Sequence, residues 1–426
     1  MAVEVSKSIE IDEARLLGEL RTLSRITDCE QDPAKPEDVA VSRVVFSEND
    51  MKARAWLKQT AHDAGLRVRE DAVGNTFIRL EGTEPELPVV GTGSHTDAIP
   101  FAGMYDGTVG VLGGLEALRA IKASGLKHQR SIELLMFTSE EPTRFGIGCI
   151  GSRLLAGTID PERADALQDK EEVTMAERRR ASGFKGTLAS VKLPEHYYSA
   201  FVELHIEQGP LLEREGIELG IVTDIAAPAG YKFLIEGFGG HAGALLMPDR
   251  KDALCAAAEI ILSIEKNALA TGSINTVATV GTCDVHPGAV NSVPSRVLLQ
   301  VDIRDTDPAR REGVMQRVRT EVDDIRKRRG VTITETQVNA DEPAQSSTHI
   351  VELIESICKA EGITYKKMVS RAYHDSLFMA RIAPVTMIFI PCRGGVSHRP
   401  DEYAAPEAIT RGARVLAATL AQLACE

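Results

Sequence analysis

Residues 131–146, "SIELLMFTSEEPTRFG", join a strand-forming apolar run directly to two adjacent carboxylates, Glu140 and Glu141, followed by Pro142. Two like charges side by side repel each other, and the end of a buried strand solvates them poorly. The pair can be a polar exit from a strand into an exposed loop. It can also divide two tasks, with one carboxylate binding a metal ion and the other handling a proton.

The segments around this stretch indicate an α/β sheet. Residues 87–95 (LPVVGTGSH) predict a strand, and a helix is expected after "YDG", where Val111, Leu115 and Leu118 recur at helical spacing. With 131–139 as the next strand, the order is strand, helix, strand. Strands this apolar are typical of a sheet covered by helices.

Other elements extend this first domain in both directions. Ser47 is expected to cap a helix that closes at Gly65. The remaining expectations are a helix over 11–27, strands over 66–71 and 75–82, and alternating helix and strand patterns in 349–362, 383–392 and 406–424.

Between about 227 and 341 the pattern changes to strand, helix, strand, strand, helix, strand. The start of the second helix is predicted by Asp307, as its N-cap, and by Pro308, as its first residue. This order is the split βαβ, or ferredoxin-like, arrangement. We therefore predict an inserted domain at 227–341 within a first domain made of 1–226 and 342–426. The segments 225–230 and 340–347 are expected to be the hinges.

Composition bounds the class of protein. A chain of 426 residues is too long for one ordinary hydrophobic core, so two domains are expected. A content of 43% hydrophobic and 26% charged residues is normal for a globular protein. The net charge of −13 argues against nucleic acid and anionic membranes as partners, and an anionic substrate would need a local arginine. Seven scattered cysteines without a CxxC pair favour a reducing compartment. The start "MAVEVSKSIEIDEARLL" lacks the pattern of a signal peptide, and no segment reads as a membrane span, so we expect a cytoplasmic protein.

Three histidines lie in short polar segments that follow apolar runs: His95, His205 and His398. Each alone could be a structural histidine. Together with Asp106 and the Glu140–Glu141 pair they suit a two-metal site in which one carboxylate bridges the ions. Asp97, two residues after His95, could orient that imidazole as a hydrogen-bond acceptor.

The motifs that contain these residues resemble the two-metal amidohydrolases that act on ureido compounds. They are "GSHTDAIPFAGMYDGTVGVLG", "FTSEEPTRFGIGCIGSRLLAG", "ELHIEQGPLLE", "GHAG", "VDIRD" and "GGVSHRPDEY", and they occur in the family's order from about residue 12 to the end of the chain. The family includes allantoate amidohydrolase, ureidoglycolate amidohydrolase and N-carbamoyl-L-amino-acid hydrolase. The resemblance implies a metallo-exopeptidase-like α/β catalytic domain with an inserted lid and dimerisation domain.

The resemblance also implies a role for each site residue. His95 and His205 would hold one metal ion, Glu141 and His398 the other, and Asp106 would bridge them, with Glu140 as the general base. His241 would reach across a homodimer to stabilise the oxyanion on the partner's substrate. The implied substrate contacts are Gln208 for the ureido group, Asn291 and Arg304 for the carboxylate, and Tyr373 and His374 in the pocket.

Within the family, "SEEPTRFGIGCIGSRLLAG" and "SRAYHDS" are most similar to members that cleave ureidoglycolate. Relatives that act on allantoate or carbamoyl amino acids tend to carry glycine where this chain has Tyr373, and a phenol there would fit a shorter substrate. We therefore expect hydrolysis of (S)-ureidoglycolate to glyoxylate, ammonia and CO2 in purine and allantoin breakdown. Hydrolysis of allantoate or an N-carbamoyl amino acid, an aminopeptidase activity, and a non-catalytic binding protein are the alternatives.

Several residues keep a second interpretation. His241 could be a turn histidine, Arg304 could form a surface ion pair, and Tyr373 could simply pack. His374 could line the pocket or support a metal ligand. Manganese is the expected metal because carboxylates supply much of the donor set and no thiolate is offered, but zinc also fits.

Overall fold

The computed structural model describes residues 9–35 and 38–426, which divide into two compact units. The first comprises the described residues up to Thr223 together with Gln345–Met368 and His374–Glu426, and the second comprises Asp224–Ala344 and Val369–Tyr373. The chain thus changes unit within three residues of the boundaries drawn from the sequence. The return of Val369–Tyr373 to the second unit was not foreseen. Residues 1–8, which begin the segment read for a signal peptide, lie outside the described residues.

The first unit is built on a sheet with the order β15-β8-β17-β7-β4-β6-β3-β2, in which β16 also pairs with β8. Strands β17, β7, β4 and β6 are parallel neighbours, whereas β3 and β8 run antiparallel to this centre. The strands are β2 (Arg67–Glu70), β3 (Thr76–Leu80), β4 (Val89–His95), β6 (Ile132–Phe137), β7 (Tyr198–Ile206), β8 (Leu219–Ile225), β15 (Ala344–Gln345), β16 (Tyr365–Ser370) and β17 (Val385–Ile390).

Helices cover both faces of this sheet, as the apolar strands predict. Along β6, Leu134 and Met136 belong to a core cluster with residues of α4 and α13, whereas Leu135 and Phe137 point into a second cluster with residues of α5. The alternation places a hydrophobic core on each side. The helices of this unit are α2 (Glu13–Ser24), α3 (Glu48–Asp63), α4 (Thr108–Ser124), α5 (Ile150–Ala156), α6 (Pro161–Asp165), α7 (Met175–Ala181), α8 (Leu211–Glu215), α11 (Thr348–Glu361), α12 (Asp375–Met379) and α13 (Pro406–Cys425).

Local signals set the helix ends. The Ser47 side chain accepts a hydrogen bond from Asp50 N, which confirms the expected N-cap of α3, and Gly65 follows with a φ of 66°. Helix α2 is shorter than the expected 11–27 because Asp12 caps it and a turn follows Ser24. Short elements that periodicity did not reveal are α5 to α8, the 3-10 turns at Leu188–Ser190 and Arg393–Gly395, and the pair β1 (Val41–Arg43) and β5 (Ala98–Ala102).

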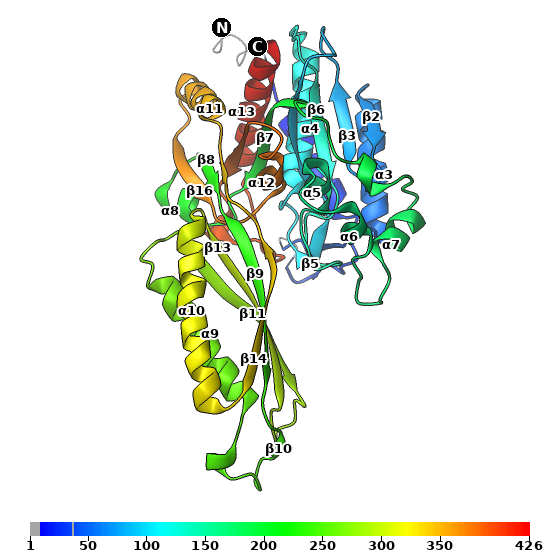
Figure 1. Cartoon of the computed structure of the whole chain (residues 1–426). Coiled ribbons are helices and arrows are strands. Elements are labelled where there is room, and N and C mark those ends of the chain that lie inside the picture. Colours follow the sequence, from blue (N-terminus) through cyan, green and yellow to red (C-terminus); the bar gives the residue numbers. More distant parts are fainter. Residues whose placement is uncertain (1–8, 36–37) are drawn as a thin grey trace. The chain divides into compact units, whose positions relative to one another are not determined.

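The second unit is a four-stranded antiparallel sheet with the order β11-β13-β9-β14. Helices α9 and α10 pack against it, as the lower part of Figure 1 shows. The chain order is strand, helix, strand, strand, helix, strand, which is the ferredoxin-like arrangement. The elements are β9 (Ala227–Glu236), β10 (Gly240–His241), the 3-10 turn Met247–Asp249, α9 (Ala253–Leu269), β11 (Val277–His286), β12 (Ser292–Val293), β13 (Arg296–Asp305), α10 (Pro308–Arg329) and β14 (Thr332–Ala340).

One expectation about this unit is wrong. The segment 225–230, interpreted as a hinge, is largely the first part of β9, where Ala227 already pairs with Asp305 and Pro228 with Arg304. Its small residues and proline concealed a strand whose backbone is held in the ladder. Across the described ranges 9–35 and 38–426, no helix combines the length and the apolar character needed to span a bilayer.

Candidate metal centre

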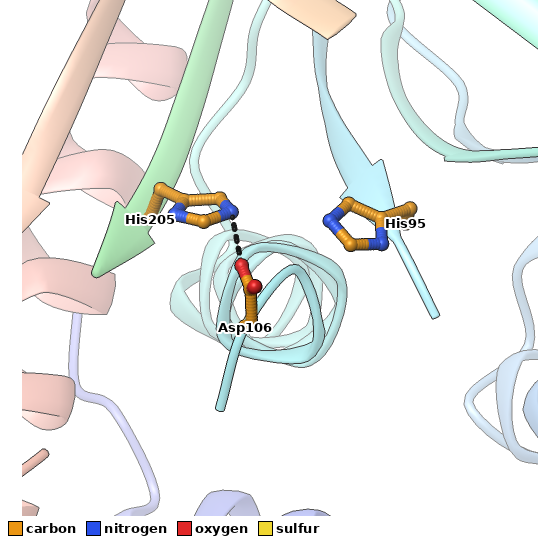
Figure 2. A group of neighbouring side chains, drawn as sticks. All are labelled: His95, Asp106 and His205. Atoms are coloured by element: carbon orange, nitrogen blue, oxygen red, sulfur yellow. Dashed lines mark ion pairs between the residues drawn. The ribbon is translucent and has the colours of Figure 1, made fainter. Parts of the chain in front are cut away.

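Two of the predicted ligands lie at the carboxyl ends of neighbouring parallel strands. His95 is the last residue of β4, and His205 is the penultimate residue of β7. Loops and helix starts at this edge of an open α/β sheet commonly form ligand sites. Asp106 precedes α4, and Figure 2 shows its carboxylate between the two imidazoles, paired with His205.

The Asp106 carboxylate joins two groups of possible metal ligands. Its Oδ1 lies 3.1 Å from His205 Nε2, and its Oδ2 lies 3.0 Å from His398 Nε2, which is itself 3.2 Å from Glu141 Oε1. Ligand atoms of His95, Asp106 and His205 lie within 4.8 Å of one another, and so do those of Asp106, Glu141 and His398. All five predicted ligands therefore converge, and Asp106 belongs to both groups.

Backbone carbonyls fix the tautomers of the two strand-end histidines. The Nδ1 of His95 lies 2.9 Å from the carbonyl of Asp97, and the Nδ1 of His205 lies 2.9 Å from that of Ile206. A carbonyl can only accept, so each Nδ1 carries the proton. In a neutral ring this leaves the lone pair on Nε2, the nitrogen that is then available for metal coordination.

Gly107 allows His95 to approach the start of α4. Its φ is 66°, and a Cβ added there would lie 2.4 Å from His95 Nε2. Any larger residue would therefore displace the atom that is placed to bind metal.

The two glutamates of the opening stretch follow β6, and a turn positions them. Ser139 has a φ of 57°, and Cys149 N donates to the carbonyl of Glu140 at 2.8 Å. The Asp97 carboxylate accepts from Glu140 N at 3.3 Å and from Glu141 N at 3.1 Å. Asp97 thus orients His95 through its backbone carbonyl, while its side chain, 3.7 Å from His95 Nδ1, holds the glutamate turn.

The glutamate side chains diverge. Glu141 contacts His398, whereas Glu140 Oε2 lies 3.7 Å from His95 Nε2 and its Oε1 lies 3.4 Å from Cys149 Sγ. Burial raises the pKa of Glu140 well above its ordinary value, and the neighbouring carboxylates, Glu141 first among them, raise it further. Glu140 belongs to neither of the two groups of possible metal ligands.

The charges at the centre shift the remaining pKa values. Burial raises the pKa of Glu141, against the opposing effect of His398. Burial also opposes ionisation of Asp106, but hydrogen bonds to His205 and His398 bring its pKa well below the usual range. Hydrogen bonds to Asp106 and Glu141 raise the pKa of His398 to about 11. A cluster with this many buried carboxylates is suited to positive charge.

Gln208 also faces the bridging carboxylate. Its Nε2 donates to Asp106 Oδ1 at 2.9 Å and to Oδ2 at 3.0 Å, and its buried Oε1 has no hydrogen-bond partner. Its backbone φ is 53°, a conformation that is uncommon for residues other than glycine. The neighbouring Glu207 has a structural task, because its carboxylate accepts from the amides of Leu211 and Leu212 at the start of α8.

His374 is buried against His205. Its ring centroid lies 4.4 Å from that of His205, and Glu203 joins the same cluster. Sequence analysis missed Glu203, whose carboxylate accepts from Ser94 Oγ and Ser376 Oγ at 2.9 and 2.6 Å. Its position two residues before His205 on one strand places both side chains on the same face, so strand periodicity could have identified it.

Four further site candidates lie in the second unit, at two ends of its sheet. Arg304 donates to both carboxylate oxygens of Asp302 at 2.8 and 3.2 Å, and its guanidinium lies 5.1 Å from the Tyr373 ring centroid. His241 and Asn291 are exposed residues beside the β10–β12 pairing, joined by a hydrogen bond from Ala242 N to the Asn291 carbonyl.

Comparison with known proteins identifies the family. Residues 91–422 match the model of the peptidase family M20/M25/M40. The chain belongs to this family. The M20 chain is 52% identical to a ureidoglycolate hydrolase of Oryza sativa subsp. japonica, over 91% of this chain and 81% of the relative. It is 48% identical to a ureidoglycolate hydrolase of Arabidopsis thaliana, over 100% of this chain and 89% of the relative.

A solved structure agrees with these relatives. The crystal structure of AtUAH in complex with glyoxylate superposes with a TM-score of 0.91 at 48% identity, covering 99% of this chain and all of the other. A second AtUAH structure holds (S)-hydroxyglycine. The expected resemblance and the expected α/β fold are confirmed, and the chain is a metal-dependent amidohydrolase of the M20 family.

The donor set fits the ions that this family uses. M20 enzymes are typically dinuclear metal enzymes. Here the imidazoles of His95, His205 and His398 and the carboxylate of Glu141 lie around the carboxylate of Asp106. Nitrogen and oxygen donors of this kind suit Mn²⁺ or Zn²⁺.

Proposed function

We propose that this M20 chain hydrolyses (S)-ureidoglycolate. The observation that carries the proposal is the convergence of His95, Asp106, Glu141, His205 and His398 beside a carboxylate that is not a ligand, in a chain about half identical to ureidoglycolate hydrolases over nearly its whole length. Addition of one water gives (S)-hydroxyglycine, ammonia and CO2. Loss of a second ammonia from (S)-hydroxyglycine gives glyoxylate, and these two molecules are the ones named in the AtUAH complexes.

His95 and His205 would hold one ion and Glu141 and His398 the other, with Asp106 shared between them. When bound, the ions polarise the ureido carbonyl and make water more acidic. Manganese is the proposed metal because Asp106 and Glu141 supply carboxylate oxygens and none of the ligands is a thiolate.

Glu140 takes the proton of the attacking water and delivers it to the leaving nitrogen. Its raised pKa supports this role, because a base whose pKa lies closer to the working pH can accept and then release a proton. Asp97 keeps the carboxylate aimed by holding the backbone amides of residues 140 and 141.

Five side chains of this chain would recognise the substrate. The buried Gln208 Oε1 has no partner and can accept from a ureido N–H. Arg304 would bind the substrate carboxylate in two-point geometry, exchanging one carboxylate partner, Asp302, for another. Asn291 would donate to the same carboxylate, and Tyr373 and His374 would limit the pocket to a short substrate.

His241 would stabilise the oxyanion. Gly243 N donates to His241 Nδ1 at 3.1 Å, which leaves the proton of a neutral ring on Nε2, exposed and able to donate. His241 and Arg304 cannot both act on one substrate within one chain. The β9–β13 ladder from Pro228, opposite Arg304, to Glu236, opposite Arg296, is roughly 26 Å long at ~3.3 Å per residue, and His241 lies beyond that end in the separate β10–β12 pair. A ureidoglycolate molecule spans a small part of that length, so one of the two residues must come from another copy.

The second unit carries a surface suited to a homodimer. Strand β11 is an edge of the sheet, with hydrogen-bonding groups open on one side. Helix α9, which packs beside β11, exposes Leu262 and Leu269 by 62% and 75%. A second copy placed edge to edge would cover both the open strand and the leucines.

Replacing Leu262 with glutamate tests this interface. We expect the variant to run as a monomer in light scattering and to lose activity, because His241 would have no partner site. Thr320→Glu on α10 adds the same charge at another exposed helix position and should stay dimeric. A dimeric, fully active L262E protein would contradict the interface.

The scattered cysteines support a cytoplasmic location for this assembly.

The substrate is tested by ammonia release from the manganese-loaded protein. (S)-Ureidoglycolate, allantoate and an N-carbamoyl-L-amino acid are supplied in parallel. We expect kcat/KM to be greatest for ureidoglycolate. Faster turnover of allantoate or of the carbamoyl amino acid would overturn the proposed substrate, and no turnover of any of them would overturn the proposed reaction.

A further inference from the structure

We propose that Glu402 is a positioning residue of the metal centre, where it holds together the two loops that supply Asp106 and His398. The inference rests on the proposed metal-binding function. Glu402 is 3% exposed and takes no part in the proposed reaction. It lies four residues after His398 in the "GGVSHRPDEY" motif.

One oxygen of Glu402 fixes the bridging ligand. Oε1 accepts from the backbone amides of Tyr105 at 2.8 Å and of Asp106 at 3.0 Å. These amides belong to the turn that precedes α4. Holding both of them sets the position of the Asp106 Cα and limits the directions in which its carboxylate can point.

The other oxygen of Glu402 reaches the loop of the exposed ligand. Oε2 lies 2.8 Å from Ser397 Oγ, and Ser397 immediately precedes His398. The same hydroxyl lies 3.1 Å from Asp106 Oδ2. One buried carboxylate therefore connects segments nearly 300 positions apart in the sequence, each of which supplies a metal ligand.

His398 has particular need of such a connection. It lies between the 3-10 turn Arg393–Gly395 and α13, in a stretch without helix or strand. Its φ is 60°, a conformation that is unfavourable for a residue with a side chain. Its side chain is 46% exposed. His95 and His205, in contrast, are held by the ladder of the sheet.

Gly103 makes room for Glu402. A Cβ added to Gly103 would lie 2.3 Å from Glu402 Cβ and 2.6 Å from Oε1. The φ of Gly103 is not positive, so alanine imposes no left-handed backbone strain, and the three atoms nearest to its Cβ would all belong to Glu402. Gly103→Ala is therefore a way to displace Glu402 without changing it.

The experiment measures manganese binding by titration calorimetry and by electron paramagnetic resonance. The wild-type protein should bind two ions per chain with the spectrum of a coupled pair. Glu402→Ala should lower the affinity for one of the two ions roughly 10- to 100-fold, which is the usual effect of losing a group that supports metal ligands. It should also remove the spectrum of the coupled pair. Glu402→Gln keeps an acceptor for both amides and a donor for Ser397, so it should restore the pair.

The controls separate positioning from general damage. Glu407→Ala removes an exposed carboxylate in the first turn of α13 and should bind both ions normally. If Glu402→Ala does not fold, Gly103→Ala and Ser397→Ala decide the question. Both variants should bind one ion with lower affinity and unfold at the same midpoint as the wild-type protein. Normal binding of two ions by all the folded variants would overturn the role of Glu402. A wild-type protein that binds no manganese would instead overturn the metal site itself.

Discussion

Replacing Glu140 with glutamine should separate metal binding from proton transfer. The glutamine has nearly the same shape, and its side-chain oxygen can still accept from Cys149 Sγ, which lies 3.4 Å from Glu140 Oε1. Glu140 belongs to neither ligand group, so the variant should keep two ions. It cannot take a proton from water. We expect kcat to fall about 10²- to 10⁴-fold, the usual contribution of a general base, which corresponds to ~2.7–5.4 kcal/mol in the barrier.

The same substitution should stabilise the metal-free protein. Burial, followed by the charges of Glu141 and other carboxylates, raises the pKa of Glu140 in the folded state. A carboxyl with a raised folded pKa contributes its full stability below its unfolded pKa of about 4.3 and loses it as the pH rises through the folded value. The advantage of E140Q over the wild-type protein should therefore grow with pH.

Three measurements on one preparation check these expectations: metal content, ammonia release from ureidoglycolate, and the unfolding midpoint in chelator over a range of pH. Glu86→Gln makes the same chemical change at an exposed position and should leave all three unchanged. An E140Q protein with two ions and normal turnover would refute the assignment of the base. A metal-free E140Q protein less stable than wild type at neutral pH would refute the electrostatic reasoning.

Other perturbations test the remaining parts of the site. Gly107→Ala imposes a φ of 66° on alanine, which costs ~1–2 kcal/mol, and its Cβ would collide with His95 Nε2. We therefore expect a lower unfolding midpoint and, by metal analysis, the loss of one ion. A variant that retains two ions would contradict this expectation. Arg304→Gln should lower kcat/KM for ureidoglycolate about 10- to 100-fold through loss of charged hydrogen bonds, and unchanged kcat/KM would show that the arginine only pairs with Asp302. Removing the metals with a chelator should lower the unfolding midpoint of the wild-type protein, because an ion present at 100 times its Kd adds ~2.7 kcal/mol to the free energy of unfolding. An unchanged midpoint would argue against a coupling between metal binding and folding.

Parts of the site follow from the sequence because strands dictate them. His95 and His205 lie at the ends of apolar runs that are typical of buried parallel strands, and such strands bring their carboxyl ends to one edge. The ferredoxin-like insert was likewise recognisable from the order and spacing of its helices and strands. Its boundary was less clear, because 227–230 reads as a flexible segment and lies in the ladder.

Other parts depend on tertiary contacts that no local pattern encodes. Asp97 was expected to orient His95 as a hydrogen-bond acceptor, and it does so through its backbone carbonyl, but the task of its carboxylate in holding the glutamate turn was not foreseen. The approach of Glu402 to Tyr105 and Asp106 joins distant segments, so periodicity gives no sign of it. His398 was expected in a short polar segment after an apolar run, and it lies eight residues beyond Ile390 in a loop with a positive φ, which no pattern in the sequence indicated.

Crystals of the manganese-loaded protein, measured at a wavelength where manganese scatters anomalously, give the most direct test. We predict two anomalous peaks per chain, one bonded to His95 and His205, the other to Glu141 and His398, with Asp106 touching both. A single peak, or peaks away from Asp106, would contradict the two-ion centre and the chemistry built on it.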